Sequence, residues 1–348
     1  MGIQLSSLVH GNEIKIEELY GKRISVDAFN WIFQFLTTIR GHDGEPLKDS
    51  KGRVTSHLSG LFYRNINLIE AGAKLVYVFD GEPPDFKRKE IERRKGVREE
   101  ARKEWIKAKD EGREKDALKY AKRSATMDDD IIKTSKELLN AMGISVIQAP
   151  GEGEALASYM VKNNDVWCVG TQDFDALLFG ASRIIRNLSI SGKRKYMKTE
   201  YTSTNPELLL LNDVLEKLGI THDQLIMLGI LIGTDYNLGG VRGYGPVKSL
   251  KIVKEKKTLE NVMKEVDWTF DISAEDIFNF FKFPSIVKYD IHFGHVDEES
   301  IKKILCDEHD FSEQRVENGI NRLKGQIKSK KSKKPDKGKQ SSLGGFGV

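Results

Sequence analysis

The sequence predicts an α/β fold in which a mostly parallel central sheet is flanked by helices on both faces. Short apolar runs typical of buried strands alternate with helix-like segments, and hydrophobic residues make up 39% of the chain, which is enough for a core. In addition, five segments end or turn in acidic residues, and three of them close such apolar runs. Because the carboxyl ends of parallel strands converge on one crevice, we expect these acidic residues to meet there.

The first 80 residues predict the order strand, helix, helix, strand. The run 24–27 predicts a short strand, and the aromatic-rich segment 28–38 predicts a helix. Apolar residues at helical spacing predict an amphipathic helix over 56–71, and 74–79 predicts the next buried strand. The glycine and prolines of 81–84 then end this regular pattern.

The segment 85–127 differs in composition, because it holds few apolar residues and many charges. From 87 to 123 there are sixteen basic residues and nine acidic ones. Lys87, Arg94 and Arg98 are spaced so that they would share one helical face. One interpretation is a solvated, charged helical hairpin; the other is a basic, poorly packed element over the acidic crevice that engages backbone phosphates. With so little apolar area, we expect this segment to be mobile without ligand.

Alternating strands and helices resume after this segment. We expect helices over 131–142 and 152–162, and strands over 144–147, 166–170 and 183–187. Further helices are expected at about 208–218, 221–233 and 246–254, and the region 258–325 is expected to be helical. A lysine- and serine-rich tract begins at Lys328 and cannot bury a core, so we expect disorder over 328–348.

Seven acidic residues form a candidate metal site: Asp27, Asp80, Glu152, Glu154, Asp173, Asp175 and Asp235. Taken singly each has another explanation, since an acidic residue often caps a helix or gains from its dipole. Asp173 and Asp175 bracket Phe174, and an extended backbone would place both on one side. Together, seven carboxylates would repel one another without cations, which indicates Mg²⁺, with Mn²⁺ as a substitute. Two such ions can drive in-line cleavage of a phosphodiester.

The glycine-rich run 239–248 lies between two predicted helices and forms a second candidate site. Gly243 and Gly245 permit a tight turn that presents backbone N–H groups, and Pro246 suits the first position of the next helix. Lys248 adds positive charge to that helix N-terminus. The pattern favours a grip on a DNA backbone; the alternative is an ordinary glycine turn between helices.

Other features exclude several classes of protein. Two cysteines, Cys168 and Cys306, make neither a disulfide framework nor a C-x-x-C zinc pattern. The sequence has no signal peptide and no apolar span of about 18 residues, so we expect a soluble, intracellular protein that does not contact membranes. The net charge of +4 is modest, and its distribution is more informative than its sum.

Taken together, these motifs resemble those of a flap endonuclease, the structure-specific 5′ nuclease of replication and repair with a PIN-like fold. The resemblance runs from Met1 to about residue 325 and is carried by 26–28, 78–84, 149–155, 171–175 and 233–236. It implies cleavage of DNA phosphodiesters at single-strand/duplex junctions, as in Okazaki fragment maturation, with accompanying 5′–3′ exonuclease action. The alternatives are a related repair nuclease or 5′ exonuclease of the same fold, and a non-catalytic DNA-junction or clamp-binding scaffold.

The resemblance implies roles for matching residues. The seven carboxylates would surround two Mg²⁺, with Asp80 and Glu152 also catalytic, and Lys87 and Arg94 would reach the scissile phosphate. Phe33 stands where the family usually has a tyrosine that stacks on the base beside the cut. The run 239–248 resembles the helix-two-turn-helix element, which often holds K⁺. The expected DNA contacts are Gly2, Phe33, Lys87, Arg94, Arg98, Gly243, Gly245 and Lys248.

The end of the chain resembles the peptide with which this family binds a sliding clamp. Gln340, Leu343 and Phe346 fit its pattern, but Gly347 stands where a second aromatic residue is expected. Phe346 can still anchor a pocket, so we expect binding to a PCNA-type clamp; the alternative is a tail without function.

We expect one nuclease domain over 1–327, followed by the tail 328–348. Its expected parts are an N-terminal region to about 98, a helical arch at about 85–127, an internal region at about 123–255 and a helical part at about 256–327. The protein is expected to act as a monomer, in the cytoplasm of an archaeal-like cell or in the nucleus of a eukaryotic one.

Overall fold

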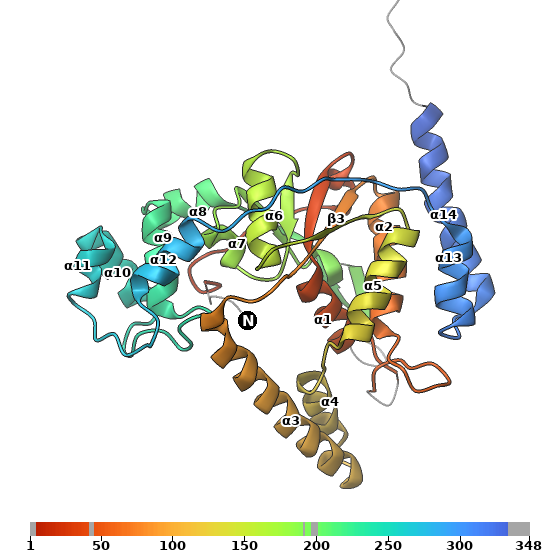
Figure 1. Ribbon diagram of the computed structural model, residues 1–348, viewed down its shortest axis with the longest axis horizontal. Helices are drawn as coiled ribbons and strands as arrows, with labels where there is room; N and C mark the ends of the chain where they lie inside the picture. The colour runs from red at the N-terminus through yellow and green to blue at the C-terminus, as the bar shows by residue number, and fades with distance from the viewer. Residues whose placement is uncertain (1–4, 42–44, 191, 196–200, 333–348) are drawn as a thin grey trace, which may run out of the picture.

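A seven-stranded mixed sheet forms the centre of the computed structural model, which describes residues 5–41, 45–190, 192–195 and 201–332 (Figure 1). The strand order is β1-β9-β6-β5-β2-β3-β4. The five strands from β6 to β4 pair in parallel, whereas β9 pairs antiparallel with β6 and β1 pairs antiparallel with β9. The mostly parallel sheet is therefore confirmed. Its strands are β1 (Asn12–Glu13), β2 (Arg23–Asp27), β3 (Lys74–Phe79), β4 (Ser145–Gln148), β5 (Cys168–Gly170), β6 (Arg183–Arg186) and β9 (Glu207–Leu210).

Helices cover both faces of the sheet, as the sequence predicts (Figure 1). The helices on one face are α1 (Ala28–Thr38), α2 (Ser56–Glu70), α5 (Asp129–Ala141), α13 (Glu298–Lys302) and α14 (Glu313–Ser332). The other face carries α6 (Gly153–Lys162), α7 (Asp175–Leu178), α8 (Leu211–Leu218) and α9 (His222–Ile232). Beyond α9 lie α10 (Pro246–Lys256), α11 (Leu259–Met263) and α12 (Ala274–Lys282).

Shorter elements connect these layers. Three 3₁₀ turns occupy Ile16–Leu19, Asp85–Lys87 and Leu188–Ile190, and a π-helical turn occupies Lys303–Asp307. A separate two-stranded sheet pairs β7 (Gly192–Lys195) with β8 (Tyr201–Thr204). None of the described helices is long and apolar enough to span a bilayer.

Strand β3 shows why the central strands have near-continuous apolar runs. Val76 and Val78 contribute to the core on the α6 side, whereas Leu75, Tyr77 and Phe79 contribute to the core on the α1 side. All five side chains are buried. A strand that is covered on both faces cannot alternate apolar with polar residues, so its first polar side chains appear where it ends.

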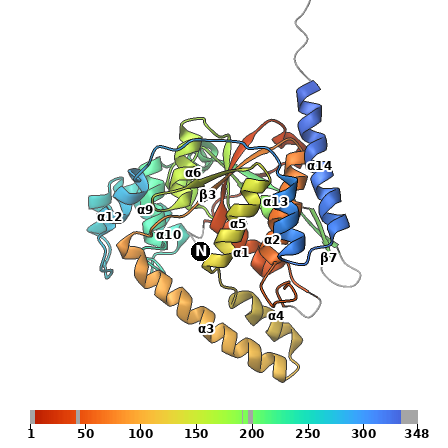
Figure 2. The ribbon, with the colours of Figure 1, turned by 45° about the vertical axis from the view of Figure 1, so that its right-hand side comes forward.

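The segment after β3 forms two helices that project from the body of the molecule, α3 (Arg88–Asp110) and α4 (Glu114–Arg123). Figures 1 and 2 show them side by side and away from the sheet in both views. Arg40 after α1 donates from Nη2 to the carbonyl oxygen of Ala121, 2.8 Å away, and so ties α4 to the body. We call α3 and α4 the helical arch. Ala101, Ala108 and Ala121 are small side chains buried in it, consistent with its apolar-poor composition.

Some predicted element boundaries are wrong, and the region 258–325 is helical only in part, since 283–297 form neither helix nor strand. The helix predicted over 208–218 begins only at Leu211, because 207–210 form strand β9, with Leu209 opposite Ile184 of β6. A short apolar run suits a buried strand as well as a buried helix, and here sheet pairing decides. The tail predicted to be disordered from 328 begins as helix, since α14 continues to Ser332. Lysine and serine are compatible with helix extension once α14 is nucleated.

A buried histidine pair joins α2 and α5 to the chain after α13. His57 Nε2 lies 2.9 Å from Thr134 Oγ1, and His309 Nδ1 lies 3.1 Å from Asp49 Oδ2. Burial lowers the pKa of His57 from 6.5 to about 3, and the charge of His309 adds to this effect. His57 is therefore neutral in the folded protein at pH values where the unfolded chain protonates it.

This difference predicts a loss of stability on acidification. Because the pKa of His57 is depressed on folding, its stabilising contribution is present above 6.5 and is lost as the pH falls toward 3. Each proton bound only by the unfolded chain changes the free energy of unfolding by about 1.4 kcal/mol per pH unit. We expect His57→Gln to flatten the dependence of the unfolding free energy on pH between about 3 and 6.5, by an amount that corresponds to at most one bound proton. Urea denaturation at a series of pH values measures this dependence. His10→Gln, at an exposed position, is the matched control.

Candidate active site

Seven carboxylates lie at or near the carboxyl edge of the parallel strands. Asp27 ends β2, Asp80 follows β3, and Asp173 follows β5. Because β2 pairs with both β3 and β5 in parallel, these three ends share one edge. The other four come from helix termini: Glu152 and Glu154 at the start of α6, Asp175 at the start of α7, and Asp235 after α9.

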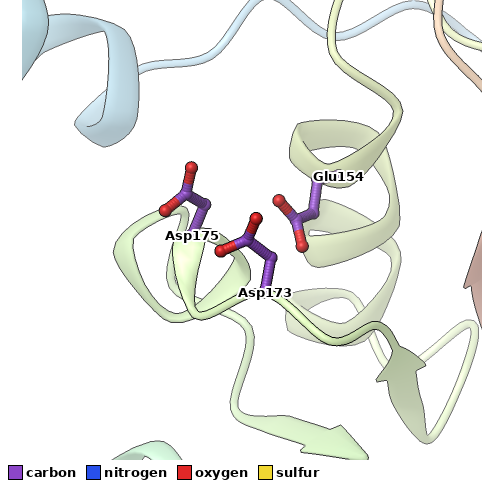
Figure 3. Close-up of side chains that lie close together, drawn as sticks. All are labelled: Glu154, Asp173 and Asp175. Carbon is purple, nitrogen blue, oxygen red and sulfur yellow. The ribbon is translucent and has the colours of Figure 1, made fainter. Parts of the chain in front are cut away.

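Three of these carboxylates form a compact cluster (Figure 3). Glu154, Asp173 and Asp175 each offer an oxygen atom, and these atoms all lie within 4.8 Å of one another. Figure 3 shows the three side chains converging from α6, from the loop after β5 and from α7. Such a set of oxygen ligands suits a hard divalent cation better than a thiophilic one.

The backbone around Asp173 is a turn, not the extended segment that the sequence predicts. The Asp173 amide donates to Thr171 Oγ1 over 3.1 Å, and Phe174 has α-helical backbone angles. Asp175 then begins α7. Extended geometry over 173–175 is therefore wrong, because the Thr171 side chain closes the turn. The outcome for the carboxylates is the same, since Phe174 is buried and both aspartates reach the cluster.

Asp80 is held against the start of α6. Its Oδ1 accepts a hydrogen bond from the Gly153 amide over 2.7 Å. A Cβ atom at Gly153 would lie only 2.7 Å from the same oxygen and 3.2 Å from the Val78 carbonyl oxygen, so a larger residue here would displace the Asp80 carboxylate. Glu152, the residue before Gly153, forms an ion pair with Lys87, whose Nζ lies 2.6 Å from Glu152 Oε2. Within the Glu152-Gly153-Glu154 motif, Glu152 therefore pairs with Lys87, the Gly153 amide holds Asp80, and Glu154 belongs to the compact cluster.

The pKa values show how far burial, and then mutual repulsion, disfavour the ionised form of these carboxylates. Burial, followed by repulsion from Asp80 and Asp173, raises the pKa of Asp27 to about 8. Burial and repulsion from Glu152 raise the pKa of Asp80 to about 6. Burial and the charges of Asp173 and Asp27 raise the pKa of Glu154 well above its ordinary value. Negative charge in excess of the local cations is the condition under which a divalent ion binds most favourably.

The base of the arch brings basic side chains to this cluster. Arg94 donates from Nη2 to Asp235 Oδ2 over 2.6 Å, and Lys87 Nζ lies 4.0 Å from the same oxygen. One turn further along α3, the guanidinium carbon of Arg98 lies 5.6 Å from the ring centre of Phe33 on α1. Lys87, in the 3₁₀ turn before α3, and Arg94 thus both reach Asp235, whereas Arg98 lies beside Phe33.

The glycine-rich run forms the turn between α9 and α10, outside the carboxylate cluster. Gly240 and Gly243 have positive φ angles of 64° and 81°, and a Cβ at Gly240 would come within 2.3 Å of the Ile232 backbone. Gly245 caps α10. Gly243, Gly245 and Lys248 are exposed, and Lys248 Nζ lies 4.0 Å from the ring centre of Tyr244. The turn therefore leaves backbone N–H groups and a cation on the surface.

Four predicted contact residues lie outside the described part of the chain: Gly2, Gln340, Leu343 and Phe346. Three residues of the site were not predicted. Thr171 donates from Oγ1 to Glu154 Oε1 over 2.8 Å, and the buried ring of Tyr236 has its centre 5.9 Å from Lys87 Nζ. Glu90 is buried in the arch between two arginines. Only Glu90 had a usable signal, because it precedes Arg93 and Arg94 by one helical turn.

Comparison with known proteins agrees with this geometry. Residues 1–101 match the XPG N-terminal domain and residues 143–235 match the XPG I-region. Flap endonuclease 1 of Pyrococcus furiosus is 50% identical over 345 residues, which cover 99% of this chain and 98% of that protein. Flap endonuclease 1 of Pyrococcus horikoshii is 51% identical, with 99% and 97% covered.

Solved structures give the same result. Flap endonuclease-1 from Methanococcus jannaschii has a TM-score of 0.75 and 40% identity, covering 94% of this chain and all of that one. The catalytic core of Rad2 in complex with a DNA substrate has a TM-score of 0.67 and 25% identity, covering 90% of this chain and 96% of that core. The PIN-like 5′ nuclease fold expected from the sequence is confirmed.

Proposed function

The chain belongs to the flap endonuclease family, and we propose that it cleaves DNA where a 5′ single strand leaves a duplex. It is a nuclease, and roles in replication and repair, including Okazaki fragment maturation, follow from the family. The observation that carries the proposal is the meeting of seven carboxylates from separate segments beneath two cationic side chains of the arch. A DNA-binding scaffold has no need of such a concentration of partly buried negative charge.

We propose two divalent ions, Mg²⁺ or Mn²⁺, held by Asp27, Asp80, Glu152, Glu154, Asp173, Asp175 and Asp235. The donor set is all oxygen, and the raised pKa values of Asp27 and Asp80 indicate carboxylates that a cation would stabilise. When bound, such ions supply an activated water and stabilise the leaving oxygen of a phosphodiester. The closest set, Glu154, Asp173 and Asp175, would hold one ion.

The remaining roles belong to side chains of this chain. Lys87 and Arg94, now paired with Glu152 and Asp235, would turn to the scissile phosphate and neutralise its developing charge. Phe33 would stack on the neighbouring base, and Arg98 would contact the 5′ strand that the arch encloses. The exposed turn with Gly243, Gly245 and Lys248 would hold the duplex backbone without reading sequence, and its carbonyl oxygens would coordinate K⁺.

We propose further that residues 1–327 act as one nuclease domain and that the protein works as a monomer. An end-labelled double-flap DNA, incubated with the protein with and without Mg²⁺, tests the activity directly. We expect cleavage near the junction only with the metal, and binding that weakens steeply as salt rises. Intact flap DNA in the presence of Mg²⁺ would contradict the proposal. Parallel reactions on bubble and gapped DNA would separate a flap endonuclease from related nucleases of the same fold.

Divalent metal is also expected to stabilise the folded protein. A carboxyl group whose pKa rises on folding stabilises the fold below its unfolded pKa, and this is lost as the pH rises through about 6 for Asp80 and about 8 for Asp27. Bound metal relieves the repulsion between ionised carboxylates. Because more of these carboxyl groups are ionised at pH 8 than at pH 5, the increase in Tm on adding Mg²⁺ should be larger at pH 8. At a Mg²⁺ concentration one hundred times its Kd, the free energy of unfolding should increase by about 2.7 kcal/mol.

The comparison of metal-bound and metal-free protein at each pH cancels the contribution of His57, which is common to both. Calorimetry with MgCl₂ or EDTA measures the difference. A metal-induced increase in Tm that is equal at both pH values, or absent at both, would contradict a site made of these carboxylates.

The C-terminal residues are proposed to bind a PCNA-type sliding clamp. Deleting 340–348 should remove the stimulation of cleavage by the clamp and leave basal cleavage unchanged, because these residues are far along the chain from every carboxylate of the site. A chain that lacks only Val348 is the control. Cleavage assays with and without the clamp measure both rates, and full stimulation of the shortened chain would show that the clamp contact lies elsewhere.

A further inference from the structure

Glu90 is an unusual residue in the arch, because its carboxylate is buried in a helix that is otherwise strongly charged and solvated. Its side chain is only 3% exposed. Among the described side chains of α3, the other buried ones are the small Ala101 and Ala108. A buried carboxylate is costly unless it is paired, so its partners indicate what it does.

Both partners of Glu90 are arginines of the same helix. Arg94 Nε donates to Glu90 Oε1 over 2.6 Å, and Arg93 donates from Nη2 to Oε1 over 2.9 Å and from Nε to Oε2 over 2.7 Å. Burial alone would raise the pKa of Glu90, but the hydrogen bonds from Arg93 and Arg94 outweigh it and lower the pKa. The carboxylate is therefore ionised and fully engaged.

The two arginines differ in their surroundings. Arg93 is half exposed, with 49% of its side chain in solvent, and it anchors Glu90 from outside. Arg94 is directed inward and also donates from Nη2 to Asp235 Oδ2 over 2.6 Å. Glu90 thus occupies the Nε donor of the Arg94 guanidinium and leaves the neighbouring Nη2 donor directed at Asp235 in the acidic crevice.

We propose that Glu90 is a positioning residue for Arg94. The guanidinium is planar, and its donors have fixed directions, so a partner on the Nε edge sets where the Nη atoms point. When a DNA phosphate takes the place of Asp235 as the partner of Arg94, Glu90 keeps the group in the required orientation. The side chain then loses less conformational freedom at the moment of reaction. This inference rests on the proposed nuclease function.

Single-turnover cleavage of a double-flap DNA by saturating enzyme with Mg²⁺ tests the inference. We expect Glu90→Ala to lower the cleavage rate about 10- to 100-fold, as is typical when a supporting partner is removed, with little change in the Kd for flap DNA. Glu90→Gln, which can still accept a hydrogen bond from Arg94 Nε, should recover part of the rate. The matched control is Glu92→Ala, which removes the same charge from an exposed position of α3.

A double-mutant cycle separates positioning from general support of the arch. If Glu90 acts through Arg94, adding Glu90→Ala to Arg94→Ala should cause less than a threefold further loss. Independent effects of the two substitutions, or an unchanged rate for Glu90→Ala, would overturn the proposal. If Glu90→Ala does not fold, by circular dichroism, the same cycle is run with Glu90→Gln. Failure of the unmodified protein to cleave would instead refute the proposed function, and with it the inference.

Discussion

Alanine at Asp175 is expected to abolish cleavage while leaving the affinity for flap DNA largely intact. Asp175 is buried, and its carboxylate lies within 4.8 Å of oxygen atoms from Glu154 and Asp173. Removing it takes away a proposed metal ligand but none of the basic side chains that would contact phosphates. The rate should fall by about 100-fold or more, since even loss of a supporting partner of a metal site typically costs 10- to 100-fold.

Asp235→Ala is expected to have a comparable effect for a less simple reason. Asp235 is a partner of Arg94 as well as a proposed metal ligand, so its loss also leaves Arg94 with Glu90 but without its contact to the cluster. Asp213→Ala, at an exposed position of α8, is the control for both variants. Single-turnover rates with Mg²⁺, together with Kd values measured in Ca²⁺ or EDTA, separate chemistry from binding. Turnover of Asp175→Ala at the rate of the unmodified protein would refute the metal assignment.

The carboxylate cluster illustrates what sequence alone can predict here. Asp27, Asp80 and Asp173 follow buried apolar runs, and parallel pairing makes the ends of such runs coincide. No side-chain detail is required for that inference. The turn at 171–175 could not be predicted in the same way, because it depends on the Thr171 hydroxyl bonding both the Asp173 amide and Glu154.

Tertiary contacts also explain the other differences. The run Leu208–Leu210 lies in a strand because β6 offers an open edge, a fact that periodicity within 208–218 does not contain. Glu90 lies in a charge run for which solvent exposure is the usual interpretation. Its burial follows from the position of α3 over the crevice, where Arg94 must reach inward to Asp235. The spacing of Glu90 from Arg93 and Arg94 signals an ion pair, but its burial becomes visible only in the folded chain.

Replacing Lys87 with alanine is also expected to have a large effect, about 10²- to 10³-fold on the rate, the range found when one donor to a transition-state charge is removed. Lys87 stands at the start of the arch, with Nζ 2.6 Å from Glu152 Oε2. Burial alone would lower the pKa of Lys87, but the carboxylates of Glu152, Asp80 and Asp235 outweigh it and raise that pKa. The ammonium is therefore charged throughout the working pH range. Its charge is thus available wherever negative charge develops on the phosphate.

The effect should be on the rate and not on binding, because Lys87 is one cation among many that the arch and the 239–248 turn present to DNA. Lys95→Ala removes the same charge from an exposed position next to Arg94 and provides the comparison. Both variants should lower the salt slope of binding by at most about 0.9, the share of one phosphate contact. Only Lys87→Ala should slow cleavage by bound enzyme. Equal rates for the two variants would mean that Lys87 contributes general electrostatic attraction, and the catalytic charge would then have to come from Arg94 alone.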